Sequence, residues 1–222
     1  AMFINLDDVF REQAEADFKA LLPKIKELAP SVTIKAKIAN QDPKLYILSF
    51  LKGRDFDLIV TGTKGLSALK EMTVGSTTAF LMDNTSIPLV AVPDEYKFAG
   101  LRKIVVGMDK EASHVDALLP IVPIAQKSGA EVLFVNTTDD ADEVAAKEQS
   151  LDFSGVPNRV LSIPTGESIP KALSQFSLEE RGDLLVMIHR RRPWLERLFK
   201  SSLTKEELFD IKTPLLILPA KA

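Results

Sequence analysis

The chain has 222 residues, of which 45% are hydrophobic, and a formal net charge of −3. A chain of this length can bury more than one small hydrophobic core, and its slight negative charge argues against nucleic-acid binding as its main task. It contains no cysteine, no apolar run long enough to span a membrane and no signal peptide, so we expect a cytoplasmic protein without thiol chemistry.

The first part of the chain predicts a helix, a strand and a second helix. Apolar residues recur every three or four positions from Val9 to Leu28, and Pro23 is expected to kink or divide this helix. A strand is expected at Val32–Ile38. Asp42 followed by Pro43 is typical of a helix start, because aspartate caps free N–H groups and proline fits the first turn.

The next segment combines an apolar strand with two glycine clusters. The strand Asp57–Thr61 runs into Gly62 and Gly65, and after nine intervening residues Gly75 and Ser76 open an apolar helix. Glycines let the backbone approach a ligand closely, and free N–H groups at a helix start favour phosphate oxygens. The pattern therefore indicates an anion site, with a tight turn as the alternative because paired glycines after strands are common.

The C-terminal part of the chain predicts alternating strands and helices. A strand at Lys103–Asp109 precedes a helical segment at Val115–Gln126 that is interrupted by Pro120 and Pro123. The remaining expected elements are strands at Glu131–Asn136, Arg159–Ile163, Asp183–Met187 and Pro214–Leu218, and a helix at Ser168–Phe176. Continuous apolar strands separated by helices indicate an α/β fold whose parallel sheet is covered on both faces.

The chain also contains an internal repeat. An offset of 126 residues superimposes Asp57-Leu58-Ile59-Val60 on Asp183-Leu184-Leu185-Val186, and Pro88-Leu89-Val90 on Pro214-Leu215-Leu216. We therefore predict two tandem domains, each a doubly wound parallel sheet. The first copy is residues 1–98 and the second copy is residues 99–222.

The two copies differ where a ligand would bind. Under the same offset, Ile188 replaces Gly62 and Arg191 replaces Gly65, while Ser201 and Ser202 replace Gly75 and Ser76. Bulky side chains there would block the close approach of a ligand to the backbone. We therefore expect the second copy not to bind a nucleotide, or to bind something else.

The first copy is shorter at its front than the second. Residues equivalent to at least 24 positions of the second copy are missing before Val32, enough for a strand and a helix. We expect a gap between the strands at Val32–Ile38 and Asp57–Thr61. Three explanations are open: the natural protein is longer, residues have been omitted, or a partner molecule fills the gap.

The order of strand, G-x-x-G, spacer, G-S-T-T, helix and then Ile87–Pro93 resembles the universal stress protein family. That resemblance implies two flavodoxin-like domains and a strand-ending acid near the adenine and ribose, matched here by Asp109. It implies ATP binding, with AMP, ADP and an accompanying Mg²⁺ ion left open. The nucleotide contacts that it implies are Gly62, Thr63, Gly65, Gly75, Ser76 and Thr77.

The same resemblance implies a role in the stress response through binding and signalling, not through catalysis. The sequence offers two histidines, His114 and His189, and lacks H-E-x-x-H, Walker and Rossmann patterns, which disfavours a metal enzyme, a P-loop hydrolase or a dehydrogenase. A basic run at Arg190–Arg192 beside Trp194 fits a solvated helix face or a grip on an anion. A scaffold that binds no nucleotide and a weak ATP hydrolase stay as alternatives.

Both copies end in an apolar strand bracketed by prolines, Pro88–Pro93 and Pro214–Pro219. The sheet order of the family makes these edge strands, and an unpaired apolar edge favours pairing with another strand. We expect the two edges to meet antiparallel around Val90 and Leu216, as an internal pseudo-dimer. A further homodimer stays open, and no nucleic-acid or membrane partner is expected.

Overall fold

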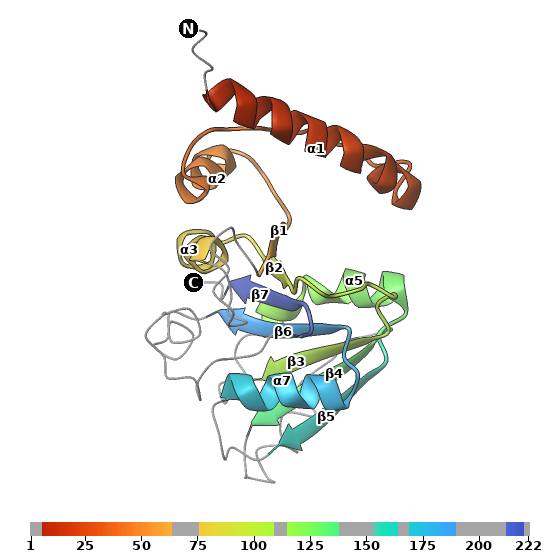
Figure 1. The fold of residues 1–222 in the computed structure, drawn as a ribbon. Coiled ribbons are helices and arrows are strands. Elements are labelled where there is room, and N and C mark those ends of the chain that lie inside the picture. Colours follow the sequence, from red (N-terminus) through yellow and green to blue (C-terminus); the bar gives the residue numbers. More distant parts are fainter. Residues whose placement is uncertain are drawn as a thin grey trace, which may run out of the picture. The chain divides into compact units, whose positions relative to one another are not determined.

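The computed structural model describes residues 6–63, 76–108, 115–137, 153, 155–163, 169–189 and 212–219 (Figure 1). In chain order, its elements are α1 (Leu6–Leu28), α2 (Pro43–Leu51), β1 (Ile59–Gly62), α3 (Ser76–Asn84), β2 (Leu89–Val92), β3 (Lys103–Met108), α4 (Val115–Leu118), α5 (Ile121–Ser128), β4 (Glu131–Thr137), β5 (Asn158–Ile163), α7 (Ile169–Glu179), β6 (Leu184–His189) and β7 (Leu215–Pro219). The chain divides after Lys52 into two compact units.

The first unit contains α1 and α2. Of the two effects expected of Pro23, a kink or a division, division is wrong, because helix α1 continues through this residue. The Asp42 carboxylate caps α2 as predicted, accepting the N–H groups of Lys44 at 2.9 Å and Leu45 at 3.2 Å. The predicted strand at Val32–Ile38 is also wrong, because these residues have no regular structure. A strand needs a neighbouring strand for its hydrogen bonds, and no other strand is found among the described residues of this unit.

The second unit is built on one seven-stranded sheet in the order β1-β2-β7-β6-β3-β4-β5 (Figure 1). All neighbours are parallel except β2 and β7, which are antiparallel with Val90 opposite Leu216. The predicted antiparallel meeting of the two edges is therefore confirmed. Its consequence is that the strands of both copies form one continuous sheet, in which this pair joins the two predicted sheets.

The internal repeat is visible in the register of the strands. Ile59 lies opposite Leu89 in the β1–β2 pair, and 126 residues later Leu185 lies opposite Leu215 in the β6–β7 pair. The two strand pairs are therefore equivalent residue by residue. The division of the chain at residue 98 stays a prediction.

Opposite faces of β3 pack against different helices. Ile104 and Val106 belong to the same buried core as Leu118 of α4 and Ile121 of α5. On the other face, a Cβ atom at Gly107 would lie 2.5 Å from Leu173 Cδ1 of α7. Because successive residues of a strand point to opposite faces, α4 and α5 cover one side of this sheet and α7 covers the other, as predicted.

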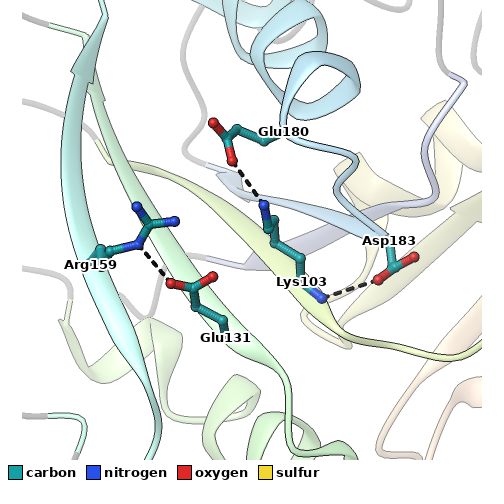
Figure 2. A network of polar contacts seen from close by, with 5 residues as sticks. All are labelled: Lys103, Glu131, Arg159, Glu180 and Asp183. Carbon is teal, nitrogen blue, oxygen red and sulfur yellow. Dashed lines mark hydrogen bonds and ion pairs between the residues drawn. The ribbon is translucent and has the colours of Figure 1, made fainter.

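Charged side chains form contacts at the N-terminal ends of the four strands β3, β4, β5 and β6 (Figure 2). Lys103 Nζ donates to the Glu180 carboxylate at 2.8 Å, and Arg159 Nε donates to the Glu131 carboxylate at 2.6 Å. The main-chain N–H of Lys103 donates to the Asp183 carboxylate at 3.1 Å. We call these five residues the strand-start network. Open α/β sheets bind ligands at the opposite, C-terminal ends of their strands, so the network has a structural role.

Candidate nucleotide site at the start of helix α3

The predicted nucleotide loop joins the C-terminal end of β1 to the start of α3. Gly62 is the last residue of β1 and is exposed, and Thr63 follows it half-buried. Helix α3 begins with Ser76, which is exposed, and Thr77, which is half-buried. Outside the described residues lie the other two glycines of the pattern, Gly65 and Gly75.

A buried threonine fixes the first turn of α3 beside the end of β1. Thr78 is 1% exposed, and its hydroxyl oxygen lies 2.9 Å from Thr61 Oγ1 and 3.3 Å from the Gly62 carbonyl oxygen. The Thr61 hydroxyl also lies 3.5 Å from the Val90 carbonyl oxygen, so these hydroxyl contacts reach from the helix to β2. The two ends of the predicted loop are therefore held together by contacts that do not involve a ligand.

Sequence reasoning missed these positioning residues. Thr61 was expected only to end the strand, and Thr78 only to lie in the opening of the helix. The available signal was a hydroxyl residue on each side of the glycine pattern, but a hydroxyl at a helix start has many other uses. The spatial pairing of two residues 17 positions apart required the structure.

The main-chain N–H groups of this site differ in whether they are free to bind a ligand. The N–H of Thr63 donates to the Val92 carbonyl oxygen at 3.0 Å, so it extends the β1–β2 ladder and does not face a ligand. The first N–H groups of an α-helix have no partner within the helix, and the helix dipole makes that end attractive to anions. The start of α3, at Ser76 and Thr77, is therefore the part of the described site that is suited to a phosphate group.

The second copy has the same strand geometry with different side chains. Ile188 lies opposite Leu218 in β7 and is half-buried, at the position that Gly62 holds in the first copy. Met187 takes the place of Thr61 and is 3% exposed, so the hydroxyl contact to the helix has no equivalent from this strand. The expected difference between the copies is therefore present at the ends of β1 and β6.

Other residues singled out from the sequence add little to this site. His189 ends β6 and lies opposite Pro219. Outside the described residues lie Asp109, His114, Arg190–Arg192, Trp194, Ser201 and Ser202.

Two groups with shifted pKa values, Tyr96 and Glu180, lie in or beside the strand-start network. Burial raises the pKa of Tyr96, whose hydroxyl donates to the Asp183 carbonyl oxygen at 3.2 Å, and the Asp183 charge raises it further. The hydrogen bond from Lys103 lowers the pKa of Glu180, and the charge of Lys103 acts in the same direction. Because β2 and β7 are antiparallel, the edge of the sheet where β3 and β6 begin is also the edge where β1 ends, and strands β2 and β7 lie between this network and the candidate site.

Within the described ranges, no group of three or more His, Asp or Glu side chains is placed to hold a metal ion. The same ranges contain no helix with the length and apolar character needed to cross a bilayer. The chemical groups that the described site offers to a ligand are main-chain N–H groups and the hydroxyls of serine and threonine.

The sequence of the chain is similar to that of one known protein family. Residues 4–93 match the sequence profile of the universal stress protein family. Universal stress protein YxiE of Bacillus subtilis (strain 168) is 31% identical over 87 residues, which are 38% of this chain and 59% of that protein. The chain therefore spans about three fifths of this curated relative.

Solved structures match over a much larger part of the chain. A universal stress protein from Archaeoglobus fulgidus DSM 4304 has a TM-score of 0.66 and 18% identity, covering 98% of this chain and 81% of that one. A protein of unknown function from Pseudomonas aeruginosa PAO1 has a TM-score of 0.62 and 14% identity, covering 93% and 78%. At these identities the structural matches show a shared fold, and the sequence similarity to the universal stress protein family covers residues 4–93.

Proposed function

We propose that the chain binds an adenine nucleotide, with ATP as the first candidate, between the end of β1 and the start of α3. The observation that carries the proposal is the contact of Thr78 with Thr61 and Gly62, which sets the free end of a helix beside an exposed strand-end glycine. The oxygens of a phosphate group at the helix start would accept hydrogen bonds from the main-chain N–H groups there. The adenine base and the ribose would then lie over the C-terminal end of β1.

The conformation of Gly62 supports a ligand role for this glycine. It lies within β1, opposite Val92, and is not among the described glycines with a positive φ angle. A turn therefore does not require glycine at this position, and a glycine inside a strand weakens it. Close approach of a ligand to the backbone is a recognised reason to keep one there.

The proposed site belongs to the first copy alone. In the second copy, Ile188 holds the register position of Gly62, and its side chain is already half-buried. A ligand could not approach the backbone at that point as it could at Gly62. We therefore propose one nucleotide per chain, with the second copy completing the sheet.

We propose binding and signalling in a stress response as the role of the site, and not turnover. The described part of the site offers hydroxyls and N–H groups, which hold a phosphate but are poor general bases at neutral pH. A weak hydrolase and a scaffold without nucleotide are separated from this proposal by the experiment below.

The test is isothermal titration of the purified chain with ATP, ADP and AMP, each with and without Mg²⁺. Two further ligands, cAMP and dAMP, are included because universal stress proteins have been solved in complex with them, with TM-scores to this chain of 0.44 and 0.41. Gly62→Val adds side-chain bulk at a position where the strand backbone accepts valine. We expect it to weaken binding more than about tenfold, or roughly 1.4 kcal/mol.

The control variant in the second copy is Ser202→Val, at the counterpart of Ser76, and it should leave the affinity unchanged. Equal losses from both variants would contradict a site in the first copy. No binding of any of the five nucleotides would favour the scaffold. Release of phosphate faster than about one per minute, abolished by Ser76→Ala, would favour the hydrolase, since ordinary enzymes turn over about ten times per second.

A further inference from the structure

The outer edge of β1 is the starting point of a second inference, which does not depend on the proposed nucleotide site. Strand β1 ends the order of the sheet, and no described strand pairs with its outer side. The N–H groups of Ile59 and Thr63 donate to carbonyl oxygens of the neighbouring segment, those of Pro88 and Val92. The main-chain groups of the alternate residue Val60 therefore point to the outer edge.

The four-residue edge strand β1 carries neither of two common protections against pairing, a charged residue or a proline. The side chains of Leu58 and Val60 are 42% and 63% exposed, and β1 contains no charged residue. The opposite edge of the sheet is different, because β5 carries Arg159, which is paired with Glu131. Exposed edges of natural sheets are usually protected by charges, prolines or bulges, so an apolar, uncharged edge indicates an interaction surface.

The second copy shows what pairs with such an edge. Strand β6 is the repeat counterpart of β1, and its outer side is occupied by β3 in parallel register, with Val106 opposite Val186. Val186 is fully buried there, whereas its counterpart Val60 is 63% exposed. The same sequence pattern therefore has a strand partner in one copy and lacks one among the described residues of the other.

A carboxylate fixes the start of the incoming strand in the second copy. One oxygen of Asp183 accepts the main-chain N–H groups of Arg102 at 2.8 Å and Lys103 at 3.1 Å, where β3 begins. The counterpart of Asp183 is Asp57, which is exposed and precedes Val60 by three residues, as Asp183 precedes Val186. Asp57 therefore stands where a carboxylate could accept the first N–H groups of a strand added beside β1.

We propose that the outer edge of β1, together with Asp57, binds an extended polypeptide segment as an additional parallel strand. The segment resembles β3 in chemistry: it is apolar and β-branched, and it begins with two free N–H groups that the Asp57 carboxylate accepts. Main-chain hydrogen bonds with Val60 provide affinity, and burial of Val60 and Leu58 adds to it. A helix packed on the face of β1 would not supply these in-plane hydrogen bonds.

The test uses a fluorescent nine-residue peptide with the sequence of residues 101–109, titrated with the full chain in the absence of nucleotide. We expect saturable binding and slower hydrogen exchange of the Val60 amide. Val60→Pro removes the outward N–H without touching the bonds to β2, and should weaken binding more than tenfold. Val60→Thr keeps the N–H and should bind normally, whereas Asp57→Ala should weaken binding several-fold.

A change in the peptide provides a control that leaves the protein intact. Position 105 of β3 faces β6, so a peptide carrying Val105→Pro lacks the N–H that would face β1 and should bind at least tenfold more weakly. Absence of saturation up to about 1 mM peptide, or equal binding by both peptides, would overturn the proposal. Dimerisation of the chain that Val60→Pro abolishes would also overturn it, since a second copy would then occupy the edge.

Discussion

The repeat allows the contribution of one carboxylate to stability to be measured against an internal control. A single oxygen of Asp183 accepts the N–H groups of Arg102 and Lys103, and its side chain is 12% exposed. Hydrogen bonds to charged groups contribute about 1.5–3 kcal/mol each, but water can replace the carboxylate at the exposed Arg102. We therefore expect Asp183→Ala to lower the free energy of unfolding by about 2–3 kcal/mol.

The counterpart Asp57 has no strand of the described chain beside it, so Asp57→Ala should cost less than about 0.5 kcal/mol, as is usual for an exposed position. Asp183→Asn keeps an acceptor oxygen and removes the charge, and should cost about 1 kcal/mol. The Arg102 guanidinium, 3.7 Å from Asp183 and 76% exposed, adds little to either value.

Urea denaturation at pH 7 followed by circular dichroism measures all three variants, and an unchanged m-value would show that the denatured state is unaffected. Equal costs for Asp57→Ala and Asp183→Ala would refute the reasoning, because they would show that the strand start does not determine the effect. A cost below about 0.5 kcal/mol for Asp183→Ala would refute it as well, since two charge-assisted hydrogen bonds would then be worth nothing.

Two further predictions concern the contacts around α7. Lys103 lowers the pKa of Glu180 below its ordinary value of 4.5, so the ion pair stabilises the fold above that pH and loses its effect as the pH falls through the folded value. The stability difference between the wild type and Glu180→Gln should therefore be largest near pH 7 and disappear in acid titrations. Gly107→Ala would place a Cβ atom 2.5 Å from Leu173 Cδ1 and should cost about 1–3 kcal/mol in thermal or urea unfolding. Adding Leu173→Ala should give a total below the sum of the single costs, and strict additivity would contradict the contact.

Much of the second unit could be predicted because the information was local or repeated. The offset of 126 residues predicted that β1–β2 and β6–β7 are equivalent, and the register of Ile59 and Leu185 shows it. Apolar strands bracketed by prolines predicted the meeting of Val90 and Leu216, because an apolar edge has few other ways to avoid water. These inferences needed the pattern of each segment, the sheet order implied by the resemblance to universal stress proteins, and the rule that edges pair.

The errors came from elements whose structure depends on a distant partner. The sequence of Val32–Ile38 suits a strand, but strand formation is settled by the neighbour that supplies the hydrogen bonds. In the site, Gly62 and Ser76 were predicted from local pattern, whereas Thr78 acts through a residue 17 positions away. In the strand-start network, Asp183 acts through residues 80 and 81 positions away. Contacts of that range leave no periodic trace in a single sequence.

The junction between β2 and β7 offers a final prediction, because its two sides differ in burial. Leu216 is 1% exposed within the core of the second copy, whereas Val90 is half-buried and packs against that core from β2. Truncating a buried leucine costs about 2–5 kcal/mol, so Leu216→Ala should destabilise all strands together. Val90→Asp puts a charge at the seam without emptying the core, so β1 and β2 should exchange their amide hydrogens faster while β3 to β5 stay protected.

Hydrogen exchange followed by mass spectrometry separates these outcomes strand by strand. In Leu216→Ala, exchange should increase in β1 to β7 together, because the removed side chain supports both sides of the junction. In Val90→Asp, the increase should be confined to the two strands of the first copy. Unchanged exchange of β1 and β2 in Val90→Asp would show that these strands do not depend on the antiparallel pair with β7, and the single sheet would then have to be replaced by two independent ones.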